Sequence, residues 1–236
     1  MVSGVENRVQ PSIAAVAGPR DHEGMSTEIP GAGELNLPQA FLLLATNEKD
    51  GEPEVPPSVL KAALSGAILA ELDLLGAIQL QGKYVRATGD PPQSDFRHQW
   101  ELIHDKSRPH SPRRWVAMLE SRAELHRVYE GMAALGVVTH VGEKHLGVFR
   151  TTRYPEKDHT PEAALLARIE SVLNGSASDA RTAALIGLLH AAGLMDKLFP
   201  GAGPARLREL TGDHWPSRAV RDELRMIRLA EAEAAT

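Results

Sequence analysis

Two stretches of almost uninterrupted apolar residues constrain the fold more than any other feature of this chain. In the first, residues 58–76, aliphatic side chains recur at every fourth position: Leu60, Leu64, Ile68 and Leu72. The second, residues 179–200, reads DARTAALIGLLHAAGLMDKLFP and is nearly as apolar. A helix that is apolar around most of its girth has to be covered on all sides. Both stretches are therefore predicted to be central helices of one core.

The composition excludes several classes of protein. Aromatic residues make up 4% of the 236 residues, so the core must be aliphatic, and the absence of cysteine removes disulfides, thiolate metal sites and a cysteine nucleophile. No apolar run approaches the ~20 residues of a membrane span, and the first residues lack the pattern of a signal peptide. A net charge of −5 argues against nucleic-acid binding. We expect a cytoplasmic protein.

The chain divides into a tail and one domain. Residues 1–36 are rich in Gly, Pro, Ser and Glu and show no apolar period, which predicts a flexible tail. Met25 is an alternative start, in which case residues 1–24 are not translated. Residues 37–236 show no break in composition and are predicted to form a single domain.

Turn and capping residues place further helices. Pro38 suits a first helical turn, and Ser58, Ser111 (followed by Pro112) and Ser178 or Asp179 are candidate caps. Other helices are expected near 94–106, from Thr160-Pro161 to Asn174, and after Pro204 and Pro216. The helix that starts at Ser111 is expected to continue to about Leu135, with one apolar stripe formed by Met118, Leu125, Tyr129 and Met132.

Two alternating segments predict β-hairpins, with turns at Gln81-Gly82 and at Gly142-Glu143. Each follows a helix that ends in Leu-Gly. The predicted fold class is therefore mainly α-helical with two short β-hairpins in a single compact domain. The repeated helix and hairpin also leave a winged-helix DNA-binding protein open as a minor alternative.

Arg122 falls on the predicted apolar stripe, where a charge is unexpected. A buried arginine must be paired with a carboxylate or line a site for an anionic ligand. Both interpretations stay open at this stage, and the structural ion pair is preferred.

The ten histidines do not predict a metal site. His98, His104 and His110 are six residues apart and cannot share one helix face. His140 and His145 flank the second hairpin turn and could approach each other across it, but two ligands without a nearby carboxylate triad make a poor site. We therefore expect no metal and no cofactor.

Catalytic motifs are missing as well. The sequence contains no phosphate-binding loop, dinucleotide fingerprint or G-x-S-x-G elbow. His190, within the second apolar stretch, is expected to be a core residue whose ring nitrogens find partners. No enzymatic activity is predicted.

Several segments together resemble the Golgi phosphoprotein 3 family in its bacterial branch. The carriers of this resemblance, in chain order, are FLLLATNEKDG, LSGAILAELDLLGAIQL, WVAML, LGVVTHV, TTRYP and, above all, DARTAALIGLLHAAGL. They extend from about Leu37 to Leu210. The alanine- and arginine-rich, lysine-poor composition suits a high-GC bacterial member.

The resemblance implies a compact helical domain with a projecting β-hairpin and no enzymatic activity. Eukaryotic members are peripheral membrane proteins that bind phosphatidylinositol 4-phosphate at the Golgi and help to retain glycosyltransferases. They self-associate through a hairpin. Their lipid headgroup lies in a shallow basic pocket formed by a Trp and three Arg.

Only part of that pocket carries over. The Trp falls at about Pro56, the first Arg becomes Ser65, the second is Arg122 and the third is Leu125, while Arg127 matches another basic position nearby. The implied headgroup residues are therefore Arg122, Arg127 and Ser65. Losing two charge-assisted contacts is expected to lower the affinity about 100-fold or more.

Two functions follow as expectations. The first is a non-enzymatic peripheral membrane module that binds an anionic phospholipid, or a phosphate-bearing ligand, on the inner face of the cell membrane, with Arg122 as the anchor. The alternative is a regulatory or adaptor protein that keeps the scaffold and binds a protein partner without lipid. A homo-oligomer is compatible with both.

Overall fold

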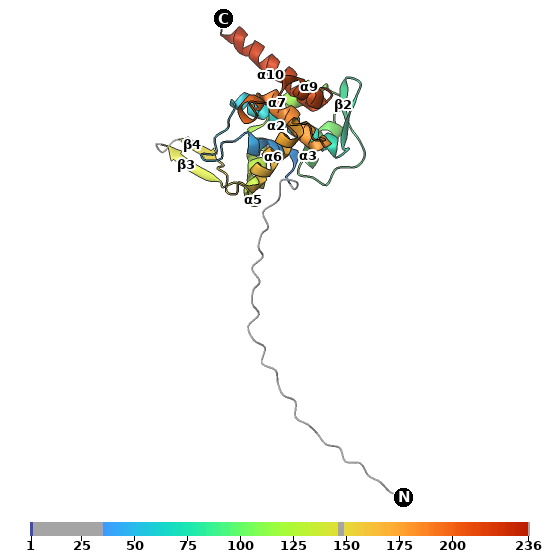
Figure 1. Ribbon diagram of the computed structural model, residues 1–236. Helices are drawn as coiled ribbons and strands as arrows, with labels where there is room; N and C mark the ends of the chain where they lie inside the picture. Colours follow the sequence, from blue (N-terminus) through green and yellow to red (C-terminus); the bar gives the residue numbers. More distant parts are fainter. Residues whose placement is uncertain (2–34, 146–148, 236) are drawn as a thin grey trace.

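The computed structural model describes Met1, residues 35–145 and residues 149–235. These residues form one compact, mainly helical body with two small antiparallel sheets (Figure 1). The predicted tail falls almost entirely outside the described residues. The helices are α1 Leu37–Leu44, α2 Pro57–Leu74, α3 Arg97–His104, α4 Pro112–Leu119, α5 Arg122–Ala134, α6 Thr160–Leu173, α7 Ala180–Ala192, α8 Met195–Leu198, α9 Pro204–Thr211 and α10 Trp215–Ala234. The strands are β1 Ile78–Gln81, β2 Tyr84–Ala87, β3 Val141–His145 and β4 Phe149–Arg153.

The two apolar stretches are the central helices α2 and α7, as predicted. They contact each other, and α10 packs against both. The four aliphatic residues spaced along α2 are all buried: Leu60, Leu64, Ile68 and Leu72. Glycines allow the close approach of α10, because a Cβ on Gly66 would lie 2.1 Å from Val220 Cγ2 and one on Gly187 would lie 2.5 Å from Ser217 Oγ.

A buried ion pair joins the two central helices. The carboxylate of Glu71 on α2 is 6% exposed and accepts two hydrogen bonds from Arg181 on α7, at 2.7 and 2.9 Å. It also accepts the Leu37 N–H at 2.7 Å. The adjacent Asp179 caps α7 by accepting from the Thr182 N–H and hydroxyl. The DART segment, which carries much of the family resemblance, thus starts one core helix and ties it to another.

Most predicted helix starts are confirmed. Pro38 lies in the first turn of α1, Ser111 caps α4 and Asp179 caps α7. Ser58 is not a cap, because α2 begins at Pro57 and Ser58 lies within its first turn.

The prediction of one helix from Ser111 to about Leu135 is wrong. Helix α4 ends at Leu119, Glu120 is extended, and Ser121 caps a separate helix α5 by accepting the Glu124 N–H at 3.3 Å. The expected apolar stripe therefore spans two helices, and Arg122 occupies the first position of the second helix.

The first hairpin forms as predicted, and the second turns later than predicted. Gln81 pairs with Tyr84, and Gly82 has a φ of +61°. In the second hairpin, Gly142 pairs with Thr152 inside the ladder, so the strand continues past the expected turn to His145. This hairpin projects from the helical body (Figure 1).

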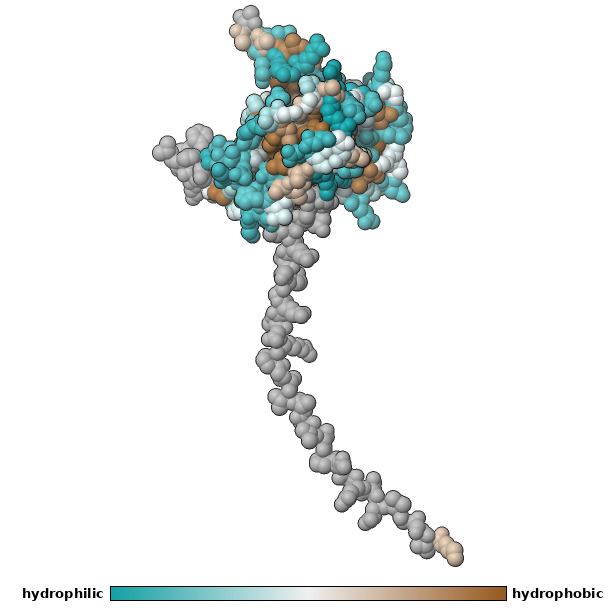
Figure 2. Space-filling model, viewed as in Figure 1, coloured by the Kyte–Doolittle hydropathy of each residue, from teal (hydrophilic) through white to brown (hydrophobic). Residues whose placement is uncertain are grey.

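No helix in the described part of the chain is long and apolar enough to cross a membrane. Helix α10 begins inside the core and projects from the body at its far end (Figure 1). Brown hydrophobic side chains lie among teal ones on that projecting end (Figure 2), where Met226 and Leu229 are exposed.

Candidate functional site

A hollow of about 650 Å³ opens where the starts of α2 and α5 meet strand β4. Its volume falls in the range of small-molecule sites. Its basic members come from three separate elements: Lys61, Arg122 and Arg153. Its other lining residues are Gly51, Glu52, Pro53, Val55, Pro57, Leu60, Leu125, His126, Tyr129, Thr152 and Tyr154.

One wall of the hollow is the loop between α1 and α2, residues 45–56. Asn47 holds this loop in a tight turn, because its side chain accepts the N–H groups of Lys49 and Asp50 and its backbone N–H donates to Glu52. Gly51 has a φ of +68°, and a Cβ there would lie 2.3 Å from the Pro155 nitrogen. The loop is therefore packed against the chain just after β4, and only glycine fits at its tip.

Arg122 is the most exposed of the three basic residues that line the hollow. Its side chain is exposed, and no hydrogen bond or ion pair of it is found among the described residues. It occupies the first position of α5, where the positive end of the helix dipole disfavours a cation by about 0.3–1 kcal/mol. The structure therefore rules out the preferred sequence interpretation, a buried arginine in a structural ion pair.

The other two cations are held differently. Arg153 is 28% exposed and pairs with Glu52 at 2.7 Å. Lys61 on α2 is half-buried and makes no ion pair within the described parts of the chain. Its charge acts on Glu120, whose pKa burial raises and Lys61 lowers. Arg122 and Lys61 thus give the hollow a net positive character.

The floor of the hollow is aromatic and polar but uncharged. Tyr129 and Tyr154 stack with ring centroids 4.4 Å apart. The Tyr129 hydroxyl lies 2.6 Å from Thr46 Oγ1, and burial raises its pKa to about 12. Tyr154 donates to Glu130 at 2.9 Å, and burial raises its pKa as well. Both hydroxyls stay protonated at neutral pH and add no negative charge that would oppose an anion.

The structure does not bring the three predicted headgroup residues together. Ser65 is 1% exposed inside the core, where its hydroxyl donates to the Lys61 carbonyl at 2.9 Å. It is therefore out of reach of a ligand in the hollow, and it is not a headgroup residue in this structure.

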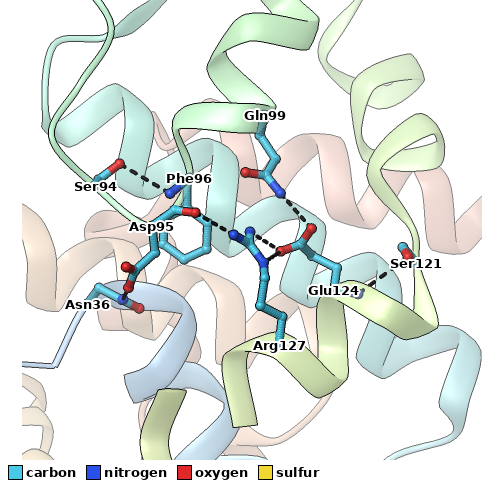
Figure 3. A network of polar contacts seen from close by, with 8 residues as sticks. All are labelled: Asn36, Ser94, Asp95, Phe96, Gln99, Ser121, Glu124 and Arg127. Carbon is cyan, nitrogen blue, oxygen red and sulfur yellow. Dashed lines mark hydrogen bonds and ion pairs between the residues drawn. The ribbon is translucent and has the colours of Figure 1, made fainter. Parts of the chain in front are cut away.

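Arg127 belongs to a structural network on another face of α5 (Figure 3). Its guanidinium donates to the Asp95 carbonyl at 2.6 Å and to the Glu124 carboxylate, and it lies over the Phe96 ring. The Glu124 carboxylate also accepts from Gln99. These contacts join α5 to the start of α3. The guanidinium of Arg127, which the resemblance assigned to a headgroup, is therefore already bound to groups of the protein itself.

His190 is less buried than predicted. It is half-buried on α7, and its Nδ1 is a buried atom with no partner in the described structure. Burial and the nearby Arg221 lower its pKa, so the ring is neutral. His140 is paired with Glu130 at 2.7 Å and not with a second histidine in the described structure.

A separate group of residues has the composition of a metal site. Glu48, Glu156, His159 and Glu162, named here the acidic cluster, each place one ligand atom within 4.8 Å of the others. Burial and the adjacent Glu156 raise the pKa of Glu162 to about 7. Sequence reasoning missed this cluster because Glu48 is far from the other three residues along the chain.

The fold and the hollow define a helical domain with a basic hollow beside a projecting hairpin. The family model for Golgi phosphoprotein 3 (GPP34) matches residues 37–227, which is most of the chain. The protein belongs to this family. No curated protein matches the chain. Placement in the bacterial branch stays a prediction.

Sequence reasoning missed Lys61 and Arg153 as residues of the hollow. Lys61 lies four residues before Ser65, one turn earlier on the same helix, and Arg153 lies in the TTRYP segment. The break at Ser121 carried a readable signal, since Ser121-Arg-Ala-Glu124 is a capping-box pattern. That pattern would have placed Arg122 at a helix start.

Proposed function

We propose that this protein is a non-enzymatic, peripheral membrane module that binds an anionic phospholipid headgroup in the hollow between α2 and α5. A headgroup like that of phosphatidylinositol 4-phosphate, which eukaryotic members of the family bind, has the phosphate oxygens that suit this site. The observation that carries the proposal is Arg122 at the start of α5, which has no ion-pair partner among the residues that the structure describes. Lys61 lines the same hollow as a second cation.

The proposed contacts differ from those implied by the sequence match. Arg122 is the anchor, Lys61 takes the place expected for Ser65, and Arg153 contributes when the phosphate competes with Glu52 for it. Arginine makes paired hydrogen bonds to phosphate, whereas lysine acts as a point charge. One arginine and one lysine, both without an ion pair in the described part of the chain, support binding with modest headgroup selectivity. Peripheral attachment to the inner face of a bacterial cell membrane, from the cytoplasm, completes the proposal.

Vesicle co-sedimentation tests this function. Neutral vesicles, vesicles with a general anionic lipid and vesicles with phosphatidylinositol 4-phosphate are compared at low and physiological salt. Arg122→Gln is expected to weaken binding about tenfold or more, because one charge-assisted hydrogen bond is worth about 1.5–3 kcal/mol. Since Arg122 makes no described ion pair, the melting temperature of the variant should stay the same or rise slightly.

Arg228→Gln is the matched control, because Arg228 is an exposed arginine on the projecting end of α10. It removes the same charge and should leave vesicle binding unchanged. Equal binding of the wild type and Arg122→Gln would contradict the proposal. Failure of the wild type to bind any vesicle would also contradict it and would favour the adaptor alternative, in which the scaffold binds a protein partner.

A further inference from the structure

The acidic cluster lies apart from the basic hollow, and the backbone fixes its position. Glu48 stands in the loop after α1, and its carbonyl accepts the Glu156 N–H at 2.9 Å. Glu156 also pairs with Val138 in an isolated bridge. His159 immediately precedes α6, and Glu162 lies in its first turn. Two stretches of chain, the loop at Glu48 and residues 156–162, thus converge on one point.

Glu156 is the buried member of the cluster. Its side chain is 2% exposed, and its Oε1 is a buried oxygen with no hydrogen-bond partner among the described residues. Its other oxygen, Oε2, lies 2.5 Å from His159 Nδ1. The Glu162 carboxyl beside it, whose pKa is raised to about 7 by burial and by Glu156, shares a proton with Glu156 when no metal is bound, and a bound cation would take the place of that proton.

The charge of the cluster also calls for a cation. Three carboxylates face one histidine, whose Nδ1 lies 3.6 Å from Glu48 Oε2. The only other basic group paired with these carboxylates in the described structure is Lys49, which is 84% exposed and 4.0 Å from Glu48. An exposed lysine at that distance contributes little. The cluster is close to neutral while Glu162 is protonated and keeps an excess of negative charge once Glu162 is ionised.

The distances suit direct coordination. Metal–oxygen and metal–nitrogen bonds of about 2.0–2.6 Å place opposite ligands at most about 4–5 Å apart. The four ligand atoms already lie within 4.8 Å of one another. Small rotations of the exposed side chains of Glu48 and His159 would bring them around one ion, with Glu156 as the fixed ligand.

We propose that the acidic cluster is a binding site for a divalent transition-metal ion, with Zn²⁺ preferred over Ca²⁺ and Mg²⁺. The histidine decides the class of metal. Imidazole suits Zn²⁺ and other transition metals, whereas Ca²⁺ and Mg²⁺ take oxygen ligands almost exclusively. This inference departs from the sequence-based expectation of no metal site. It does not rest on the proposed headgroup site, since the two sites share no ligand residue.

Calorimetric titration of the full chain tests the proposal directly. The protein is prepared without a histidine tag, stripped with a chelator, and titrated with ZnCl₂, CaCl₂ or MgCl₂. The expected result is one saturable Zn²⁺ site per chain and at least tenfold weaker binding of Ca²⁺ and Mg²⁺. Saturating Zn²⁺ should also raise the melting temperature, because an ion that binds only the folded state stabilises it.

Variants assign the site to these residues. His159→Asn and Glu162→Gln each remove one ligand and should weaken Zn²⁺ binding by about 10- to 100-fold. The matched controls are His104→Asn, an exposed histidine beside Asp105, and Glu170→Gln, an exposed glutamate further along α6. Both controls should bind Zn²⁺ like the wild type.

Three results would overturn the proposal. They are the absence of saturable Zn²⁺ binding, unchanged Zn²⁺ affinity in both ligand variants, and binding of Ca²⁺ or Mg²⁺ as tight as that of Zn²⁺. Circular dichroism of each variant without metal shows that it is folded, so that a loss of binding reports on the ligands.

Discussion

At the scale of single residues, the ion pair of Glu71 and Arg181 joins the two central helices. Glu71 cannot be left without its partner, because its carboxylate is almost fully buried. Arg181→Met should lower the free energy of unfolding by about 3 kcal/mol. This is the lower end of the cost of breaking a buried pair, since the Arg181 side chain is 35% exposed.

Urea unfolding measures this loss. A double variant, Glu71→Gln with Arg181→Met, should be more stable than Arg181→Met alone. The neutral amide still accepts the Leu37 N–H but no longer buries an unpaired charge. A double variant that is no more stable than the single one would show that lost packing, and not charge, accounts for the effect.

His214 gives the protein a predictable response to acid. Burial, followed by Arg218 and Arg221, lowers its pKa from 6.5 to about 4. Between pH 6.5 and pH 4 the unfolded chain therefore binds a proton that the folded protein does not. This difference destabilises the fold as the pH falls, by at most about 3 kcal/mol.

The free energy of unfolding, measured by urea at pH 7 and pH 4.5, checks this direction. The wild type should lose more stability on acidification than His214→Gln, which has no titrating group at that position. Equal losses in the two proteins would mean that other groups cause the acid response.

At the scale of secondary-structure elements, close helix contacts impose glycine. Gly66→Ala should lower the free energy of unfolding by about 1–3 kcal/mol through overpacking against Val220, even though alanine is the better helix former. Gly131→Ala on α5 is the matched control. The nearest atom there is Gln39 Nε2 at 3.4 Å, so the change should be neutral or stabilising.

Adding Val220→Ala to Gly66→Ala removes the atom that clashes, and it should recover part of the lost stability in a double-mutant cycle. Two independent, additive losses would show that the two helices do not meet at these side chains.

Local signals predicted the elements well where the chemistry is local. The cap at Asp179, the turn at Gly82 and the helix start at Thr160 depend on the residues themselves, so the sequence contains them. The second hairpin was misplaced because its register is decided by pairing across the strands. Gly142 is compatible with a turn, yet it pairs with Thr152.

At the scale of the whole molecule, the sequence predicted the class of fold and left the site largely open. Two helices that are apolar around most of their girth must be covered by other elements. This follows from their own sequences, whichever elements cover them. The site depends on which distant residues meet. Nothing local in the sequence brings Arg153 to Arg122 or places Glu48 beside Glu156.

The short loop between α1 and α2 is part of both proposed sites. On one side it carries Glu48 to the acidic cluster, and on the other Gly51, Glu52 and Pro53 line the basic hollow. Gly51 packs closely against Tyr154 and Pro155. A movement of the loop at Glu48 is therefore expected to be felt at Glu52 and Pro53 as well. If binding at either site changes the loop, thermodynamic linkage requires the effect to be mutual: a metal ion that raises the affinity for a headgroup by some factor is itself bound more tightly, by the same factor, when the headgroup is present.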